Sequence, residues 1–418
     1  MIEVAAPVDR AILVGAPRKG SPDADRLVEH LEELARLVDT AGAVVVGQLS
    51  QQVASPSSAT LIGEGKLEEL RELVRRTEAN LVIFDEELSP VQGANLEREL
   101  KTRVMDRAEV ILDIFSTRAR TAEAKLQVEL AQLEYLLPRL ARMWTHLSRI
   151  RGGIGLRGPG ETQLETDRRM IRRKIQHHRA RLKDVARHRD VVRSGRQPML
   201  GVALVGYTNA GKSSLLRGLT GESEIFVEDR LFATLDTLTR EVELGEGQRV
   251  RMTDTVGFIR KLPHHLVASF RATLEEAREA DLLLHVVDAS HPEWEDQVDV
   301  VEAVLSELDL AEQPSMLVFN KSDRLSDREA FVARVAELYP GAVVVNTVEP
   351  GGLAPLQSAL RARARAERPV LRVVVPHTDG KRIAEVYRAG EVVSRVDTDE
   401  GVVLGVRMPE WRARQIQG

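Results

Sequence analysis

One glycine-rich segment contains the residue types that bind phosphate groups. Residues 199–219 read MLGVALVGYTNAGKSSLLRGL, which is an apolar run, a loop from Gly206 to Gly211 and the start of an amphipathic pattern. This is the GxxxxGK[ST] loop between a strand and a helix. Its backbone N–H groups and the helix N-terminus would hold phosphates. Lys212 would reach the β- and γ-phosphates, and the Ser213 hydroxyl would ligate Mg²⁺.

Two later segments complete a nucleotide-binding pattern. The run QRVRMTDTVGF (248–258) places Asp254 at the end of an apolar strand, where the carboxylate on the magnesium side belongs, and Gly257 three residues later. Gly257 can bring its N–H close to a γ-phosphate without a side-chain clash. The run SMLVFNKSD (315–323) ends in Asn320-Lys-Ser-Asp323. The Asp323 carboxylate can accept two hydrogen bonds from guanine that adenine cannot donate, so the set predicts a GTPase.

Two loops between and after these motifs are expected to complete the site. The segment LFATLDTLTR (231–240) offers Thr234, Thr237 and Thr239, and any of these hydroxyls could complete the magnesium shell. After an expected strand at 342–346, the segment 346–353 stands where a loop that surrounds the guanine base is expected.

The composition of the chain limits the number of domains and the kinds of site that it can contain. Its 418 residues suggest two to four domains, and 43% hydrophobic with 29% charged residues is ordinary globular composition. The absence of cysteine excludes disulfides, thiolate metal sites and a catalytic thiol. No apolar run is long enough for a membrane helix and the first residues lack the order of a signal peptide, so we expect a cytoplasmic protein.

The first 116 residues are expected to form a small α/β domain. Short apolar runs at 11–16, 43–49, 81–87 and 110–115 read as strands, and helical patterns near 23–37, 65–77 and 90–101 lie between them. The sequence Gly63-Glu-Gly-Lys66 resembles a phosphate loop but lacks the full frame. We interpret it as a turn that opens a helix.

Residues 117–197 are expected to form a basic helical hairpin. Leu126, Leu130, Leu133 and four later residues to Leu147 follow a heptad spacing, and a second helical pattern runs from about 171. The region has 20 Lys and Arg against 8 Asp and Glu, a net charge of +12, while the rest of the chain carries −17 of the overall −5. Between the helices lies a tip of five glycines in ten residues, flanked by Arg151 and Arg157. A basic stalk with such a tip favours binding to folded RNA, although an inter-domain linker with a solvated face would show the same charge.

The two remaining parts are expected to be a GTPase domain at 198–366, with a parallel sheet flanked by helices, and a small α+β domain at 367–418. In the last part three strand patterns surround one helix near 380–389. Nothing in it indicates catalysis.

Several motifs resemble those of the HflX family of translation-factor-class GTPases. They are GYTNAGKSSL, LFATLD, DTVGFI and NKSD, together with KLQVELAQLEYLLPRL (125–140) and RGGIGLRGPGETQLETDRR (151–169). The resemblance covers nearly the whole chain. It implies that Thr234 is the magnesium threonine and that the partner is the large ribosomal subunit with its RNA, in ribosome splitting, rescue or biogenesis. We expect a monomer.

The chain differs from the family pattern at two places, and one further feature is shared with the family. The last guanine loop is usually Ser-Ala-x-x-Gly, whereas this chain has Asn346-Thr-Val348, and Ala108 stands where the family often has threonine. Phe258 follows DTVG, where many regulatory GTPases carry a glutamine that orients water; this feature is shared with the family. An apolar ring cannot position water, so hydrolysis is expected to be slow without a partner.

The site predicted from the sequence therefore has three parts. Lys212, Thr234 and Gly257 are the catalytic candidates, and Ser213, Thr234 and Asp254 are the Mg²⁺ ligands. The residues expected to bind GTP and GDP are Gly206, Tyr207, Thr208, Asn209, Ala210, Gly211, Lys212, Ser213, Ser214, Phe232, Ala233, Thr234, Leu235, Asp236, Asp254, Thr255, Val256, Gly257, Asn320, Lys321, Ser322, Asp323, Asn346, Thr347 and Val348. Two rival hypotheses are an ATP-dependent RNA remodeller acting through the N-terminal domain and a regulatory scaffold that binds GTP as a structural cofactor, without ribosome-stimulated turnover.

Overall fold

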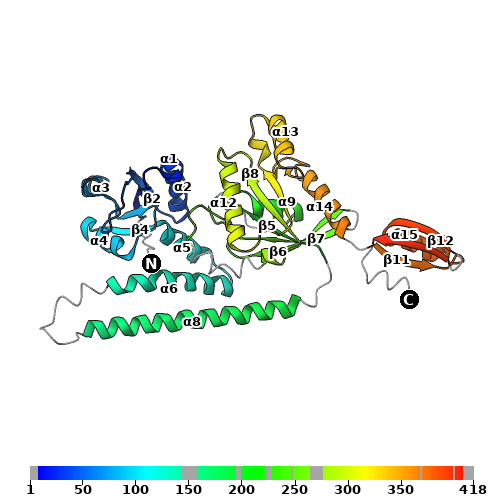
Figure 1. The fold of residues 1–418 in the computed structure, drawn as a ribbon, viewed down its shortest axis with the longest axis horizontal. Coiled ribbons are helices and arrows are strands. Elements are labelled where there is room, and N and C mark those ends of the chain that lie inside the picture. Colours follow the sequence, from blue (N-terminus) through cyan, green and yellow to red (C-terminus); the bar gives the residue numbers. More distant parts are fainter. Residues whose placement is uncertain are drawn as a thin grey trace, which may run out of the picture.

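The computed structural model describes residues 8–143, 159–193, 199–222, 224, 228, 230–245, 248–263, 276–367, 370–398 and 401–407. These residues form three separate sheets and a pair of long helices (Figure 1). Among the described helices, none is both long and apolar enough to cross a membrane.

The N-terminal sheet has four parallel strands in the order β2-β1-β3-β4. Buried leucines of α2 and α5 cover one face, and those of α3 and α4 cover the other. The elements are β1 (Arg10–Gly15), α1 (Pro22–Asp25), α2 (Leu27–Thr40), β2 (Val44–Ser50), α3 (Glu64–Thr77), β3 (Leu81–Phe84), α4 (Pro90–Leu100), β4 (Arg103–Asp106) and α5 (Arg107–Arg118).

The strand expected at 110–115 is wrong, because these residues form the middle of α5. The strand is β4, and it ends at Asp106, whose carboxylate accepts a hydrogen bond from the backbone N–H of Glu109 at 3.0 Å. That N-cap starts a helix at once. The run VILDIF is continuously apolar because this helix packs against the sheet, and a short buried run cannot be assigned from periodicity alone.

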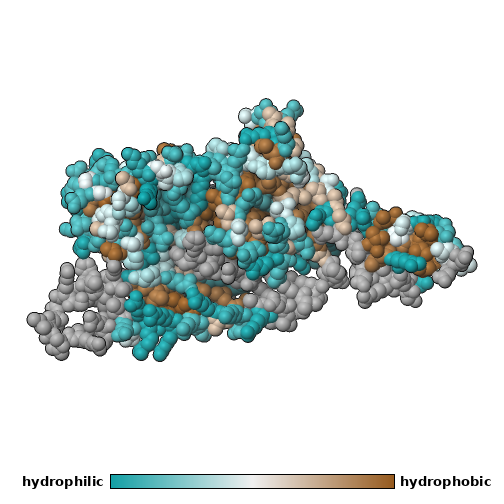
Figure 2. All heavy atoms as spheres, in the orientation of Figure 1, coloured by the Kyte–Doolittle hydropathy of each residue, from teal (hydrophilic) through white to brown (hydrophobic). Residues whose placement is uncertain are grey.

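Two helices, α6 (Ala122–Met143) and α8 (Pro159–Arg193), run antiparallel side by side (Figure 1). Leu126, Leu130 and Ile175 are buried between them, and Figure 2 shows an apolar stripe along this line with a hydrophilic surface below it. Pro138 lies inside α6 without ending it. The end of the heptad run at Leu147, together with Arg151, Arg157 and the tip between them, lies outside the described residues.

The central sheet has six strands in the order β10-β9-β8-β5-β7-β6, all parallel except β6, which pairs antiparallel with β7. Its carboxyl edge carries the glycine-rich loop and Asn320. The elements are β5 (Gly201–Gly206), α9 (Lys212–Thr220), β6 (Leu238–Gly245), β7 (Gln248–Asp254), β8 (Leu282–Asp288), α12 (Trp294–Glu307), β9 (Ser315–Asn320), the 3₁₀ turn η1 (Ser322–Arg324), α13 (Arg328–Leu338), β10 (Val343–Val344) and α14 (Ala354–Glu367).

The C-terminal part is a three-stranded antiparallel sheet in the order β11-β13-β12, with one helix against it. Its core consists of valines and Leu404. The elements are β11 (Val370–Val375), α15 (Gly380–Ala389), β12 (Glu391–Thr398) and β13 (Gly401–Arg407), as the sequence patterns predict.

A buried ionic cluster joins the N-terminal sheet to the central sheet. The Arg107 guanidinium, 3% exposed, donates to Asp85 Oδ1 at 2.8 Å and also contacts Glu33. Lys261 Nζ, from the central part of the chain, donates to Asp85 Oδ2 at 2.5 Å. Burial alone would raise the pKa of the Asp85 carboxyl, but Arg107 and Lys261 outweigh it and hold that pKa below its usual range. The cluster therefore contributes to stability only while both signs of charge are present.

Replacing Arg107 with Met is expected to destabilise the protein by about 3–5 kcal/mol, because it leaves Asp85 buried with only Lys261 as a full counter-charge. Urea or thermal unfolding measures the loss. The matched control is Arg103→Met, which removes a half-exposed ion pair with Glu109 and should cost at most about 1 kcal/mol. Equal losses of unfolding free energy in the two variants would show that the buried cluster does not stabilise the contact between the two sheets.

Candidate nucleotide-binding site

The glycine-rich loop connects β5 to α9 at the carboxyl edge of the central sheet, and its shape requires glycine at both ends. Gly206 has φ +148°, and a Cβ there would lie 2.2 Å from the carbonyl oxygen of Val286 on β8. Gly211 has φ +94°, and a Cβ there would lie 2.2 Å from Asn320 Nδ2. The Asn320 amide donates to the Ala210 carbonyl at 3.0 Å, so the NKSD segment fixes the loop.

Lys212 lies within the curve of this loop. Its ammonium donates to the carbonyl oxygens of Gly206 and Tyr207 at 3.1 and 2.9 Å and is 6% exposed. Burial lowers the pKa of Lys212 to about 8 even though Asp254 opposes the shift. A phosphate group would restore the favourable environment for its charge.

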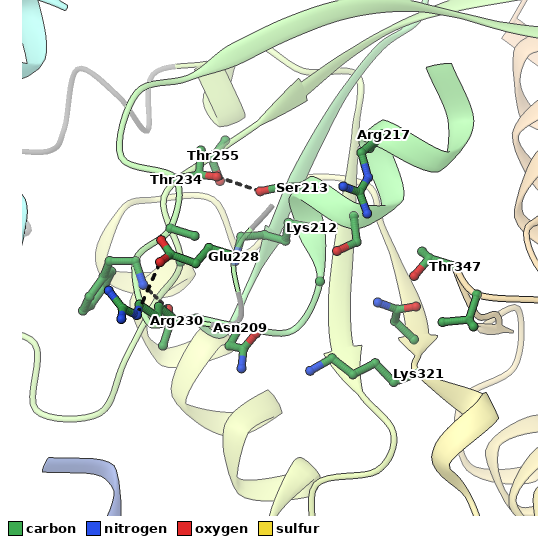
Figure 3. A pocket seen from close by; sticks show the side chains of 18 of the residues that line it. Asn209, Lys212, Ser213, Arg217, Glu228, Arg230, Thr234, Thr255, Lys321 and Thr347 are labelled. Atoms are coloured by element: carbon green, nitrogen blue, oxygen red, sulfur yellow. Dashed lines mark hydrogen bonds and ion pairs between the residues drawn. The ribbon is translucent and has the colours of Figure 1, made fainter. Parts of the chain in front are cut away.

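Side-chain oxygens from three segments converge beside Lys212. Ser213 Oγ lies 2.6 Å from Thr234 Oγ1 and 2.6 Å from Asp254 Oδ2 (Figure 3 draws Ser213 and Thr234). Burial raises the pKa of the Asp254 carboxyl, and its second oxygen, Oδ1, is buried without a hydrogen-bond partner. Two hydroxyls and a buried carboxylate with a spare oxygen suit a hard cation such as Mg²⁺. Of the three threonines that the sequence left open, Thr234 is the one at this point; Thr239 instead bonds Thr253 at 3.0 Å, within strands β6 and β7.

A cavity of about 280 Å³ extends from Ser213 and Thr234 past Lys321 to Thr347 (Figure 3), and Asp323 also lines it. The predicted residues that line it are Thr208, Asn209, Gly211, Lys212, Ser213, Ser214, Phe232, Ala233, Thr234, Thr255, Gly257, Asn320, Lys321, Asp323, Thr347 and Val348. The four segments predicted from motifs therefore meet in one place.

Other predicted residues surround the cavity without lining it. These are Gly206, Tyr207, Ala210, Leu235, Asp236, Asp254, Val256, Ser322 and Asn346. Tyr207 turns to the N-terminal part, where its hydroxyl donates to Glu33 and accepts the backbone N–H of Arg260 at 2.9 Å. Asp236 also faces away, toward Thr121.

Asn346 stands where the family that the motifs resemble usually has the serine of its Ser-Ala loop, and its side chain holds this loop in place. Its side-chain oxygen accepts the backbone N–H groups of Glu349 at 2.7 Å and Val348 at 3.3 Å, and its side chain is fully buried. Such an Asx turn holds the loop by itself. Thr347 and Val348 are thereby placed on the cavity wall.

Four lining residues were not predicted from the sequence. Arg217 stands one helical turn after Ser213 on α9, so helical spacing could have indicated it, and Arg324 directly follows Asp323. Glu228 and Arg230 carry no recognisable signal; they pair with each other at 3.3 Å beside the cavity (Figure 3).

Phe258 is 1% exposed, and its ring belongs to the core instead of the cavity. Its backbone carbonyl accepts the N–H of Thr208 at 2.7 Å, and its N–H donates to Gly206 at 3.1 Å. The segment after Asp254 is thus bonded directly to the phosphate loop.

The glycine sequence at 63–66 does not form a second cradle. Gly63 is the N-cap of α3 with φ −73°, and the helix begins at Glu64, which agrees with the interpretation as a helix-opening turn. A separate groove of about 750 Å³ lies between α4 and α6, and residues 63–66 do not line it.

Comparisons with known proteins give matches along most of the chain. Three family descriptions match in succession: "GTP-binding GTPase N-terminal" over residues 28–116, "GTP-binding GTPase Middle Region" over 118–196 and "50S ribosome-binding GTPase" over 201–321. The chain is 44% identical to GTPase HflX of Escherichia coli, covering 93% of this chain and 92% of that protein. It is also 44% identical to GTPase HflX of Magnetococcus marinus, covering 100% and 96%. Among solved structures, a GTP-binding protein from Sulfolobus solfataricus in complex with GDP is similar, with 25% identity, coverage of 85% and 99%, and a TM-score of 0.44.

Replacing Gly257 with Ala is expected to weaken the binding of GDP and GTP alike. A Cβ would lie 2.6 Å from Thr208 Cα and 3.0 Å from Lys212 Nζ, so the phosphate loop itself must move. Overpacking of about 1–3 kcal/mol corresponds to roughly a 5- to 150-fold loss of affinity, measured with fluorescent nucleotides. The control is Gly65→Ala, where a Cβ meets nothing within 4 Å. Undiminished affinity in the Gly257 variant would contradict this packing.

Proposed function

Because this chain belongs to the HflX family of GTPases, we propose that it hydrolyses GTP slowly by itself and associates with the large ribosomal subunit, which accelerates the reaction. The observation that carries the proposal is the convergence of Ser213, Thr234 and Asp254 beside Lys212, at the end of a cavity whose other end is the NKSD segment.

The phosphate loop and Lys212 bind the phosphates of GTP. Asn209, Gly211, Lys212 and Ser213 line the cavity, where free backbone N–H groups of the loop and the start of α9 would bind phosphate. The Lys212 ammonium supplies the positive charge for the β- and γ-phosphates. Gly257 brings the segment after Asp254 against Thr208, so its N–H is available to the γ-phosphate.

Ser213, Thr234 and Asp254 would hold Mg²⁺, which neutralises charge on the β- and γ-phosphates when it is bound. Thr234 is the ligand that depends on the nucleotide state in GTPases of this type, because its segment is ordered around the γ-phosphate and released after hydrolysis.

The base is selected at the opposite end of the cavity. Asp323 is exposed there and accepts the N1–H and N2–H₂ donors of guanine, while Asn346 holds Thr347 and Val348 as the loop beside the base. Lys321, ion-paired with Asp288 at 2.7 Å, supports the wall between base and phosphates.

No glutamine follows Gly257, and the Phe258 ring is buried in the core. A side chain that cannot hydrogen-bond leaves the attacking water without an orienting group from this position, so the free protein turns over slowly.

The basic helical region is the proposed ribosome-binding part. On α8, the exposed basic side chains include Arg169, Arg172, Arg173, Lys174, Arg181 and Lys183. A charged helical face of this kind suits the phosphate backbone of folded RNA, and few aromatic residues accompany it for stacking on single strands. Ribosomal RNA of the large subunit is the polyanion we propose, with the protein acting as a monomer in the cytoplasm in ribosome splitting, rescue or biogenesis.

The proposed functional units are residues 1–116, 117–197, 198–366 and 367–418. The first two would dock on the ribosome, and the third would control docking through the GTP cycle.

Asp323→Asn is expected to weaken GTP binding by about 1.5–3 kcal/mol, because it removes a charge-assisted pair of hydrogen bonds to guanine. Competition between GTP and ATP for a fluorescent nucleotide measures the change in base preference. Asp327→Asn, which makes the same charge change at the N-cap of α13, is the control and should leave the preference unaltered. A variant at 323 that keeps full preference for GTP would contradict the assignment.

The double substitution Arg151→Ala, Arg157→Ala is expected to leave GTP affinity intact and to lower the stimulation of hydrolysis by large subunits. Two phosphate-neutralising charges are lost, so subunit binding should also become less dependent on salt. Lys212→Ala gives the reference for abolished turnover, with or without subunits. Normal subunit affinity and stimulation in the double variant would mean that the tip is a spacer.

A further inference from the structure

The segment Leu231–Asp236, which carries Thr234, is held by residues more than one hundred positions earlier in the chain. These residues, Phe115–Thr121, are the α5–α6 junction, where α5 ends and α6 begins. Two kinds of contact connect the two segments, one on each side of Thr234, and an ion pair joins the junction to Glu228, which precedes the segment.

An aromatic contact holds the start of the segment. The rings of Phe232 and Phe115 meet edge to face, with centroids 4.7 Å apart and an angle of 81° between planes, and both side chains are 1% exposed. Phe232 has φ +54°, a left-handed conformation that a bulky residue adopts only when its surroundings enforce it. Its N–H donates to Thr208 Oγ1 at 2.8 Å, so the same residue is tied to the phosphate loop.

A helix cap holds the end of the segment. The Asp236 carboxylate accepts the backbone N–H groups of Arg120 at 2.9 Å and Thr121 at 3.3 Å, and the Thr121 hydroxyl bonds to it as well. The same hydroxyl accepts the N–H of Ala124 at 3.1 Å, which makes Thr121 the N-cap of α6. The negative charge of Asp236 therefore completes the N-terminus of α6, where a carboxylate is favoured.

An ion pair lies just before the segment. Arg118, in the last turn of α5, is 2.7 Å from Glu228, which lines the nucleotide cavity. The residues leading into the Thr234 segment are thus also connected to the junction.

Hydrogen bonds connect the later part of α6 to the N-terminal part of the chain. Tyr135 of α6 donates its hydroxyl hydrogen to Asp106 at 3.0 Å, and Arg139 donates to Asp106 at 3.1 Å and to the Leu88 carbonyl at 2.9 Å. A displacement of α6 would therefore change the contact between its N-cap, Thr121, and Asp236, which lies two residues from Thr234.

We infer that Asp236 is a positioning residue that couples the binding of Mg²⁺ and GTP at Thr234 to the placement of helix α6. This coupling rests on the proposed function, since it assigns Thr234 to the magnesium shell. Because coupling between two sites is reciprocal, a polyanion that moves α6 changes the affinity for Mg²⁺–GTP by the same factor as the nucleotide changes the affinity for the polyanion. GDP has no γ-phosphate to order the Thr234 segment, so its affinity is outside this coupling.

The test compares Asp236→Ala and Thr121→Ala with the wild-type protein. The two conservative variants are Asp236→Asn, which keeps an acceptor oxygen, and Thr121→Ser, which keeps the hydroxyl. Asp379→Ala, which removes the equivalent acceptor from the N-terminus of α15, is the matched control. Fluorescent GDP and a fluorescent non-hydrolysable GTP analogue are titrated with and without Mg²⁺.

The expected result is a loss of about tenfold in the Mg²⁺-dependent affinity for the GTP analogue in both alanine variants, a typical size for coupling between sites. GDP affinity stays within about twofold, the conservative variants recover most of the loss, and the control is unchanged. Equal weakening of both nucleotides, or no change in either, overturns the inference.

Hydrogen exchange gives a second readout that a merely structural role would not change. In the wild type, the amides of Ala124 and Lys125, which bond to Thr121, are expected to exchange more slowly with Mg²⁺ and the GTP analogue than with GDP. In Asp236→Ala this difference disappears. A wild type that prefers the GTP analogue but shows identical exchange in both nucleotide states disproves the coupling alone, whereas a wild type without any Mg²⁺-dependent binding of the analogue disproves the proposed function with it.

Discussion

The site depends on one geometric constraint: oxygens of Ser213, Thr234 and Asp254 must meet within hydrogen-bond distance. Two of these positions follow directly from the sheet, because β5 and β7 are parallel neighbours and their carboxyl ends bring Ser213 and Asp254 together. Thr234 has no such support, since its segment belongs to neither strand nor helix. Its position depends on Phe232, Thr208 and Asp236, and two of these contacts lead out of the central sheet.

The nucleotide site is consequently built by two parts of the chain. Tyr207 of the phosphate loop bonds to Glu33, and Lys261, seven residues after Asp254, bonds to Asp85. The buried ion pairs of Arg107 with Glu33 and Asp85 belong to the same contact region. Removing one partner of such a buried pair leaves an unpaired charge and destabilises the fold. The segments that carry Asp236 and Lys261 therefore cannot rearrange without affecting contacts to the N-terminal part.

The sequence predicted best those parts of the site that are formed by residues close together in the chain. Gly206–Ser213 and Asn320–Asp323 could be found because each motif sits at the end of an apolar strand, and the described cavity contains most of them. The prediction of a strand at 110–115 was wrong because a short apolar run is equally typical of a buried helix and of a buried strand. Asp236 was expected at the nucleotide, yet it caps α6, and no local pattern could predict a contact across 116 residues. Asn346 departs from the Ser-Ala pattern of the family, and its side chain forms an Asx turn with the backbone N–H of Glu349.

The proposed control by the nucleotide is tested most directly by measuring how ribosome association depends on GTP or GDP. Purified large subunits are sedimented with the full chain in the presence of GDP or of a non-hydrolysable GTP analogue, each with Mg²⁺ and at a fixed salt concentration. We expect the protein to sediment with the subunit in the analogue state and to be largely released with GDP. Equal association in the two states would contradict the proposed control of ribosome association by the GTP site.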